Sequence, residues 1–510
     1  MITAVALPAG GGSATVRTML EVRGDYVAGR FRLPERPDGE IVRDSPAERG
    51  RRIGVFPTSV AAADEAVAAA RRAQPAWGRL TLAERAFALG RLKDVLGART
   101  EDLARLVALE VGKAIWEARS EVAGLISKID VTAQEASIEI APRRPEGLSG
   151  ATEWRPLGVV AVLGPFNLPL HLPHGQIMAA LLAGNAVVFK PSELTPGTGQ
   201  AYAEAMDAAG LPAGVFGMVQ GEGASGARLV ENRDVDGVLF TGSFATVRRI
   251  LESTLHQPGK MVALEMGGKN AAVVLADADL ERAAVEVAQG ATLTTGQRCS
   301  ATSRLIVERT VADALVDRVA RMFREVRVGH PLAEDTYMGP LVSERARTRF
   351  LEALAAADAE PVVAGGALDL SPAGAYVAPS LRRITRRDRT SPYQQEELFG
   401  PDLAVYAVAD LDEAIALAND TEYGLVASLF SMSRPGWDEF RARVRAGVLH
   451  WNRATTGASG RLSFGGLGKS GNHRPAGVMM IRACAYPVAM LEDAGSPSRP
   501  PGFPGATRTS

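Results

Sequence analysis

The amino-acid sequence predicts an α/β protein whose strands form parallel sheets. Short apolar runs bounded by Gly, Pro or Asn alternate with segments of helical periodicity, which is the pattern of strand–helix–strand crossovers. The chain has 510 residues, too many for one hydrophobic core, so we expect two or three domains. Hydrophobic residues make up 46% and charged residues 23% of it, the balance of an ordinary soluble globular protein.

Amphipathic helices come first along the chain. Between residues 61 and 107, Ala and Leu recur at helical spacing with Arg, Glu and Asp between them, and a further helix continues through Asp130. Four buried strands separated by helices follow, at residues 158–164, 185–190, 214–221 and 237–243. The alternation resumes after Leu264 with NAAVVLA, LERAAVEVAQGAT and RLIVERT, which predicts a second α/β domain.

The charge balance gives no electrostatic reason to expect nucleic acid or a membrane as partner. The chain has 57 Lys plus Arg against 58 Asp plus Glu, a net charge of −1. Its two cysteines, Cys299 and Cys484, form neither a disulfide framework nor a metal-ligand cluster, and they fit a reducing compartment. The first residues lack the pattern of a secretory signal, and no apolar run reaches the ~18 residues of a membrane span. We therefore expect a cytoplasmic protein.

The predicted sheet indicates where a ligand binds. A doubly wound sheet binds ligands at the carboxyl ends of its strands, so the turns after Gly164, Lys190, Gly221 and Ser243 are expected to hold a nucleotide. The fingerprint G-x-G-x-x-G follows none of these strands. The fold therefore predicts a nucleotide-binding α/β enzyme without identifying the nucleotide.

Cys299 has the surroundings of a nucleophile. A free cysteine is more often a small buried hydrophobe, but this one stands in the polar segment TTGQRCS beside Arg298. An adjacent guanidinium and a nearby helix N-terminus would favour the thiolate, the form that attacks carbonyls. Cys484 lies among apolar residues on a predicted strand and is interpreted as inert packing.

If Cys299 is a nucleophile, three further positions become candidates for catalytic or cofactor-binding roles. Glu265 ends a strand in LEMGGKN and could activate water to hydrolyse an acyl intermediate. Asn167 follows a strand in GPFNLP and could donate its amide to an oxyanion. Lys190 ends the strand of FKPSE and could reach ribose hydroxyls or phosphate. Taken singly, each is more simply a solvated or turn-forming residue.

Seven segments occur in a fixed order: GPFNLP, FKPSELTP, FTGS, LEMGGKN, GQRCS, EELFGP and FGGLGKSG. Together they resemble the signature segments of the aldehyde dehydrogenase superfamily. The resemblance runs from about residue 26 to about residue 492, so the chain is identified as a member of that superfamily. It implies an aldehyde dehydrogenase fold, with a Rossmann-like cofactor domain, a second α/β catalytic domain and a small β oligomerisation flap.

The resemblance implies NAD(P)-dependent oxidation of an aldehyde to a carboxylate, with no metal. Cys299 would be the nucleophile, and Asn167 with the backbone N–H of Cys299 would hold the oxyanion. Glu265 would activate the water that hydrolyses the thioester.

The cofactor positions follow by the same resemblance. Lys190 and Glu193 match the pair on the adenosine ribose, and because the carboxylate of Glu193 would repel a 2′-phosphate, NAD is expected rather than NADP. The other cofactor positions are Gly242 and Ser243 at the pyrophosphate, Glu397 and Phe399 at the nicotinamide ribose and ring, and Pro165 and Phe166 beside them.

Domain boundaries and assembly are also implied. Flaps of this family pair across a dimer, so a homodimer or homotetramer is expected. The divisions are residues 20–140 and 155–264 for the NAD-binding domain, 265–475 for the catalytic domain, 141–154 and 478–494 for the flap, and 1–19 and 495–510 for Gly-, Pro- and Ser-rich flexible ends.

Several segments also indicate the aldehyde. HLPHGQIMAALLAGNAVVFKPSELTP, GKSGNHRPAG and ACAYPVAMLED resemble the branch that oxidises N-succinylglutamate 5-semialdehyde in arginine catabolism. HWNRATTGASGRLSFGG resembles the substrate-anchoring loop of enzymes for glutamate-type semialdehydes. Backbone N–H groups of Gly457 and Ala458 would bind a substrate carboxylate, with Phe464 at the entrance. Arg298 would add charge there, or form a salt bridge that only shapes the loop.

Other functions stay open at this point. The substrate could be another aldehyde, aromatic or aliphatic. A CoA-acylating dehydrogenase would transfer the thioester to CoA, but such enzymes commonly lack a carboxylate at the position of Glu265. A catalytically silent binding relative is disfavoured because Cys299, Glu265 and Asn167 are all present.

Four departures from the family pattern lie near the predicted site. Val247 stands where many members have Gly, and Ser463 where Pro is common. Lys269 stands where the semialdehyde branch has Asn, and Leu-Pro-Leu at residues 168–170 where Phe-Pro-Gly is usual.

Overall fold

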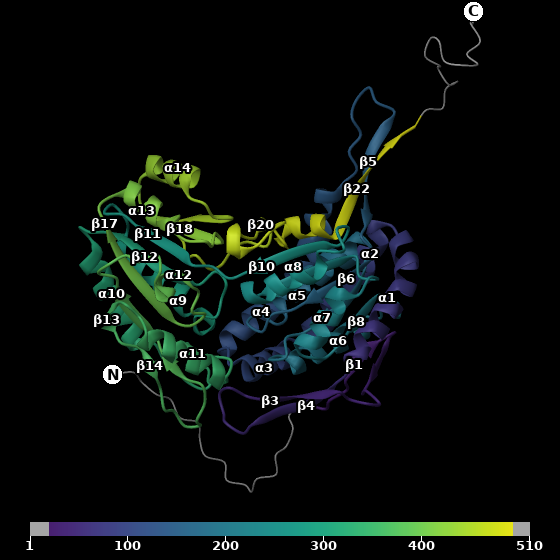
Figure 1. The fold of residues 1–510 in the computed structure, drawn as a ribbon, viewed down its shortest axis with the longest axis horizontal. Coiled ribbons are helices and arrows are strands. Elements are labelled where there is room, and N and C mark those ends of the chain that lie inside the picture. The colour runs from purple at the N-terminus through teal and green to yellow at the C-terminus, as the bar shows by residue number, and fades with distance from the viewer. Residues whose placement is uncertain (1–19, 493–510) are drawn as a thin grey trace, which may run out of the picture.

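Two seven-stranded sheets form the body of residues 20–492, the part of the chain that this computed structural model describes (Figure 1). The predicted flexible ends lie outside it. In the first sheet the strands from β10 to β8 run parallel, and β1 and β2 add an antiparallel edge. Its order is β10 (Met261–Met266), β9 (Gly237–Gly242), β6 (Val159–Leu163), β7 (Ala186–Lys190), β8 (Phe216–Met218), β1 (Asp25–Val27) and β2 (Arg30–Arg32).

Helices cover both faces of this sheet, which explains why its central strands are wholly apolar. In β6, Val160 and Val162 pack into one core and Val159 and Ala161 into the other. The first core is closed by α2 (Leu82–Ala98), α3 (Thr100–Val111), α4 (Ile115–Gln134), α5 (His171–Ala183) and α6 (Pro196–Ala208). The second is closed by α1 (Ala61–Arg79), α7 (Gly223–Glu231) and α8 (Phe244–Thr254).

The strand order reverses between β6 and β9. From β6 the chain proceeds outward through β7 and β8, and then returns to the other side of β6 for β9 and β10. Such a switch point opens a crevice at the carboxyl ends of the two strands. The turns after Leu163 and Gly242 lie there.

The second sheet is also parallel, apart from the antiparallel edge strand β13. Its order is β13 (Glu360–Val363), β16 (Ser380–Arg383), β17 (Asp402–Val408), β12 (Thr302–Glu308), β11 (Asn270–Val274), β18 (Val426–Phe430) and β19 (Val448–Trp451). One core contains α9 (Leu280–Thr292) and α10 (Ala312–Glu325), and the other contains α13 (Leu411–Ala418) and α14 (Arg434–Arg443). The helices α11 (Glu344–Ala355) and α12 (Pro392–Gln395) connect these strands.

Four two-stranded ribbons complete the fold. The pair β5 (Gly150–Pro156) and β22 (Ala485–Leu491) projects away from both sheets (Figure 1). The others are β3 (Gly39–Asp44) with β4 (Arg52–Thr58), β14 (Gly366–Ala367) with β15 (Val377–Ala378), and β20 (Ser463–Phe464) with β21 (Ala476–Gly477).

Cys484 is not on a strand, contrary to the sequence-based expectation. It ends the 3-10 segment η4 (Val478–Cys484), one residue before β22. Its thiol is fully buried and contacts the carbonyl of Met480. The pattern was misassigned because an apolar 3-10 turn and an apolar strand have the same composition.

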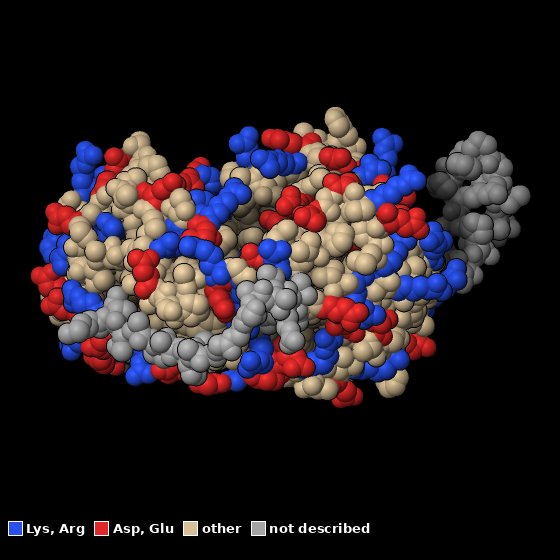
Figure 2. Space-filling view, turned by 90° about the horizontal axis from the view of Figure 1, so that it is seen from below, with Lys and Arg blue, Asp and Glu red and all other residues tan. Residues whose placement is uncertain are grey.

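Acidic and basic side chains lie next to one another across the face in Figure 2, as the near-zero net charge predicts. Among residues 20–492, no helix is long and apolar enough to cross a membrane.

Candidate active site

Three segments that are distant in sequence meet at the predicted nucleophile. The amide of Asn167, in the turn after β6, donates to the carbonyl of Gln297 over 2.8 Å. The amide of Asn270, at the start of β11, donates to the carbonyl of Cys299 over 2.8 Å. The backbone around Cys299 is therefore fastened to both sheets.

Cys299 lies in a turn between the 3-10 segment η2 (Leu293–Gly296) and β12, and its side chain faces a cavity. Burial raises the pKa of its thiol, and the charges of Glu265 and Glu397 raise it further. The charge of Arg298 lowers this pKa, as the sequence indicates, but burial outweighs it. No helix begins at Cys299, and the guanidinium of Arg298 is engaged by Glu117 over 2.7 Å.

Glu265 is a buried carboxyl group without a partner. It lies on β10, where the sequence places it at the end of a strand, and its residue is 1% exposed. Neither carboxylate oxygen has a hydrogen-bond partner. Burial raises its pKa well above the usual range, and only the charge of Arg474 opposes the shift. An orphaned acid beside a thiol is a group held ready for proton transfer.

The backbone leading to Cys299 is strained. Thr294 and Thr295 have φ of 54° and 56°, the left-handed region that threonine rarely adopts. The carboxylate of Glu117 on α4 accepts from the N–H of Thr294 over 2.9 Å and from its hydroxyl over 3.0 Å. The hydroxyl of Thr295 donates to the carbonyl of Gly339 over 2.9 Å. These bonds hold the strained turn in place.

The cavity in front of Cys299 has a volume of about 430 Å³, the size of a small-molecule site. Its walls come from α4, α5, the Cys299 turn and the loop at residues 457–460. All four predicted substrate positions line it: Arg298, Gly457, Ala458 and Phe464.

Sequence reasoning missed several residues of this wall, among them Glu117, Lys128 and His171. Glu117 and Lys128 lie on α4 and His171 begins α5. Helix α4 also contributes Glu121, so its charged positions 117, 121 and 128 share one helical face. That spacing within a helix is the signal that could have found them.

The predicted cofactor positions gather at the strand ends of the first sheet. Lys190 ends β7, and its ammonium lies 3.9 Å from the carboxylate of Glu193. Ser243 follows β9 and caps α8 by accepting from the N–H of Thr246. A buried cation, a half-exposed carboxylate and a helix N-terminus beside a switch point are the donors and acceptors that fit a dinucleotide.

The segment EELFGP reaches the same place from the second sheet. The rings of Phe166 and Phe399 meet edge to face with centroids 5.7 Å apart. Glu397 accepts from the N–H of Gly268 over 3.0 Å, and burial raises its pKa to about 7. Phe399 adopts φ 55°, a left-handed conformation that turns the segment at this contact.

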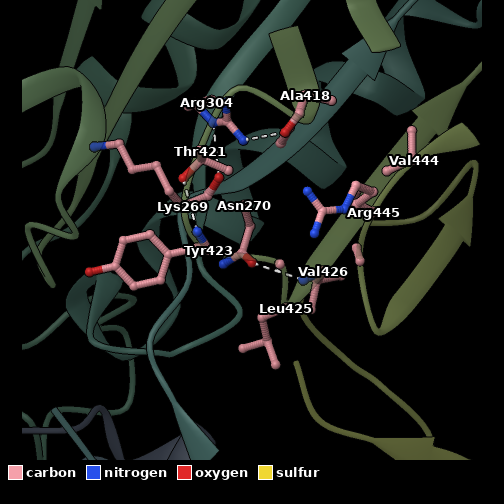
Figure 3. A pocket seen from close by; sticks show the side chains of 14 residues that line it. Lys269, Asn270, Arg304, Ala418, Thr421, Tyr423, Leu425, Val426, Val444 and Arg445 are labelled. Atoms are coloured by element: carbon pink, nitrogen blue, oxygen red, sulfur yellow. Dashed lines mark hydrogen bonds between the residues drawn. The ribbon is translucent and has the colours of Figure 1, made fainter. Parts of the chain in front are cut away.

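Two of the four residues that depart from the family pattern have structural roles. Val247 lies on α8, and its side chain is buried in the core between that helix and the first sheet. The ammonium of Lys269 donates to the carbonyls of Tyr393 and Glu396, each over 2.7 Å, and so anchors the segment before Glu397. Figure 3 shows Lys269 and Asn270 at a second cavity. At about 10 Å³ it has room for one water and no ligand.

Ser463 is exposed, whereas the adjacent Phe464 lines the main cavity. In the segment 168–170, Leu168 lines that cavity and Leu170 is buried in the core. Among residues 20–492, no group of three or more His, Cys, Asp or Glu side chains could hold a metal ion.

Comparisons with known proteins agree with this geometry. Residues 36–487 match the model of the aldehyde dehydrogenase family. The chain is 42% identical over 464 residues to an N-succinylglutamate 5-semialdehyde dehydrogenase of Chromobacterium violaceum, covering 89% of this chain and 94% of that protein. It is 43% identical to the protein of that name from Chromohalobacter salexigens, covering 92% and 94%. The crystal structure of an NAD-dependent aldehyde dehydrogenase from Sinorhizobium meliloti superposes with a TM-score of 0.89 at 34% identity, covering 94% and 96%.

Proposed function

Because the chain belongs to the aldehyde dehydrogenase family, whose members are oxidoreductases that act on aldehydes with a nicotinamide cofactor, we propose that it oxidises its aldehyde through a thioester on Cys299. The observations that support this most directly are the position of Cys299 on the cavity wall and the buried, unpartnered carboxyl group of Glu265, whose charge acts on the Cys299 thiol.

Each catalytic residue serves one step of the reaction. Cys299 releases its thiol proton to solvent and attacks the carbonyl carbon, and the resulting oxyanion accepts hydrogen bonds from the Asn167 amide and the backbone N–H of Cys299. The Asn167 amide has one N–H on Gln297 and a second that is free for this role. A bound nicotinamide cofactor supplies the hydride acceptor. Glu265, once deprotonated, takes a proton from the water that hydrolyses the thioester.

We propose NAD as the preferred cofactor. The carboxylate of Glu193 lies at the end of β7 beside Lys190, where it would accept from a ribose 2′-hydroxyl and repel a 2′-phosphate. Pro165, Phe166, Gly242, Ser243, Glu397 and Phe399 would line the rest of this cofactor site.

For the substrate we propose N-succinylglutamate 5-semialdehyde, an intermediate of arginine catabolism. Two relatives at 42% and 43% identity bear the name of the dehydrogenase for this compound. The backbone N–H groups of Gly457 and Ala458 on the cavity wall would bind a carboxylate. Arg298 shapes the turn rather than binding this anion, because its charge is already matched by Glu117.

The domain assignment follows from the same proposal. The first sheet with its helices would be the cofactor domain, the second sheet the catalytic domain, and the ribbon of β5 and β22 an oligomerisation flap. That ribbon exposes Tyr486 and Leu491, and we propose that it pairs in a homodimer or homotetramer of the cytoplasm.

The test is an NADH-formation screen over N-succinylglutamate 5-semialdehyde, glutamate 5-semialdehyde, hexanal and benzaldehyde, each with NAD and with NADP. The highest kcat/KM is expected for the succinylated semialdehyde with NAD. One charge-assisted hydrogen bond is worth about 1.5–3 kcal/mol, so the preference over hexanal should be at least about tenfold. Equal efficiency on hexanal would overturn the substrate proposal and leave the enzyme class intact.

A further inference from the structure

Lys128 extends from α4 into the cavity between two glycines. A Cβ built on Gly175 of α5 would lie 3.2 Å from Lys128 Cε, and one built on Gly460 would lie 3.5 Å from Lys128 Nζ. A side chain at Gly175 would crowd the lysine, whereas one at Gly460 would meet its ammonium group in ordinary van der Waals contact. Its half-buried ammonium group therefore lies beside the loop at residues 457–460, on the wall of the same cavity as Cys299.

The other charges on this wall are already matched. Glu117 pairs with Arg298. Glu121 forms an ion pair with the buried Lys113 and also accepts from the N–H groups of Leu170 and His171 over 3.0 and 3.1 Å. Within each ion pair the positive and negative charges cancel, so neither pair adds net charge to the cavity wall.

Lys128 is the exception. Among residues 20–492, its ammonium group has no carboxylate within ion-pairing distance and donates no hydrogen bond to another residue. Burial lowers its pKa to about 8. The neighbouring His171 adds no charge, because burial also lowers its pKa. The cavity thus presents one unmatched cation, which is the complement of one anionic group on a ligand.

The proposed substrate contains two carboxylates, and the loop N–H groups account for one of them. Resting on that proposed function, we infer that Lys128 binds the second, terminal carboxylate of the succinyl group and so selects dicarboxylic N-acyl semialdehydes. With the loop N–H groups taken by the first carboxylate, the second needs another partner, and the unmatched ammonium group of Lys128 offers one with a full counter-charge.

The inference is tested with two substrates that differ only in that carboxylate: N-succinylglutamate and N-butanoylglutamate 5-semialdehyde. Lys128→Met should lower kcat/KM on the succinyl compound roughly 10- to 100-fold, the value of one charge-assisted contact. The loss should appear in KM with kcat retained, because the contact is the same in ground and transition states. Efficiency on the butanoyl compound should stay within about threefold of wild type.

Two matched variants complete the experiment. Lys128→Arg should keep most of the succinyl preference, because it keeps the charge. Lys260→Met removes another lysine whose pKa burial lowers to about 8, at the carbonyls of Val230 and Asn232 away from the cavity, and should change neither substrate. An unchanged Kd for NAD in Lys128→Met reports that the fold is intact.

The remaining outcomes separate the two proposals. An equal loss on both compounds, or a preference that survives Lys128→Met, overturns the role of Lys128 while the proposed substrate stands. A wild-type enzyme that does not distinguish the succinyl from the butanoyl compound overturns both.

Discussion

At the residue scale, burial raises the pKa of both Cys299 and Glu265. Each pKa is raised chiefly by desolvation, and the charge of Glu265 is itself one cause of the shift at Cys299. Each group therefore disfavours ionisation of the other.

Glu265 should impose a pH dependence on thioester hydrolysis. Its pKa is raised, so the acid form persists above the usual range and the base form appears only as pH rises. The deacylation rate should therefore increase with pH and flatten above that pKa. Glu265→Gln should remove this rise of the deacylation rate with pH. It should also slow deacylation by roughly 10²–10⁴-fold, which is the usual contribution of a general base. Stopped-flow NADH measurements should then reveal a burst, and an unchanged rise with pH in the variant would assign the base to another residue.

The motifs predicted the identities of these side chains but not their ionisation. Cys299, Glu265 and Asn167 each lie where the sequence places them, after or at the end of a strand or in the turn before one. The pKa of Cys299 is raised rather than lowered because burial outweighs the charge of Arg298, which also pairs with Glu117 on a helix far away in sequence. Burial and long-range pairing are tertiary properties that a local segment does not contain.

At the scale of elements, α4 organises the site. It contributes Glu117 to the strained turn at Thr294 and Lys128 to the cavity. The sequence predicted this helix but gave its charged residues no role, because periodicity alone does not tell which face meets a neighbour. The apolar strands of both sheets were predictable because they are buried on both sides.

Glu117→Gln should weaken the turn that positions Cys299. The variant loses the ion pair with Arg298 and the charge that accepts from Thr294. Because Arg298 keeps 20% of its side-chain exposure, we expect a loss of about 1–3 kcal/mol in unfolding free energy, below that of a fully buried pair. The value of kcat should fall with little change in Kd for NAD.

The matched control is Arg119→Met, which removes an exposed ion-paired residue of the same helix. It should leave urea denaturation and kcat close to wild type. A wild-type kcat in Glu117→Gln would show that this carboxylate does not position Cys299.

At the scale of the whole molecule, the active site exists only where the two sheets meet. Cys299 stands at the amino end of β12 in one sheet, and Glu265 and Asn167 follow from strands of the other. The sequence predicted both α/β units but not their contact, since that contact depends on hydrogen bonds such as that of Asn167 to Gln297, 130 residues apart.

The projecting ribbon should govern assembly. Tyr486 and Leu491 are 46% and 77% exposed on β22, whose only strand partner among residues 20–492 is β5. Replacing both with Asp should shift the protein toward monomer in light scattering after size exclusion. Phe87→Asp, at an 80% exposed position on α2, is the control and should leave the mass unchanged. Oligomers that survive the double substitution would place the interface elsewhere.

The central claim is a covalent acyl-enzyme on Cys299 that Glu265 helps to hydrolyse, and intact-protein mass spectrometry tests it most directly. Glu265→Gln mixed with NAD and the aldehyde should gain the mass of the aldehyde less two hydrogen atoms, because hydride transfer converts the adduct into a thioester. Peptide mapping should place that mass on Cys299, with the same gain when Cys484 is replaced by Ala and none when Cys299 is. NADH formed without any adduct, or an adduct that persists in Cys299→Ala, would contradict the account.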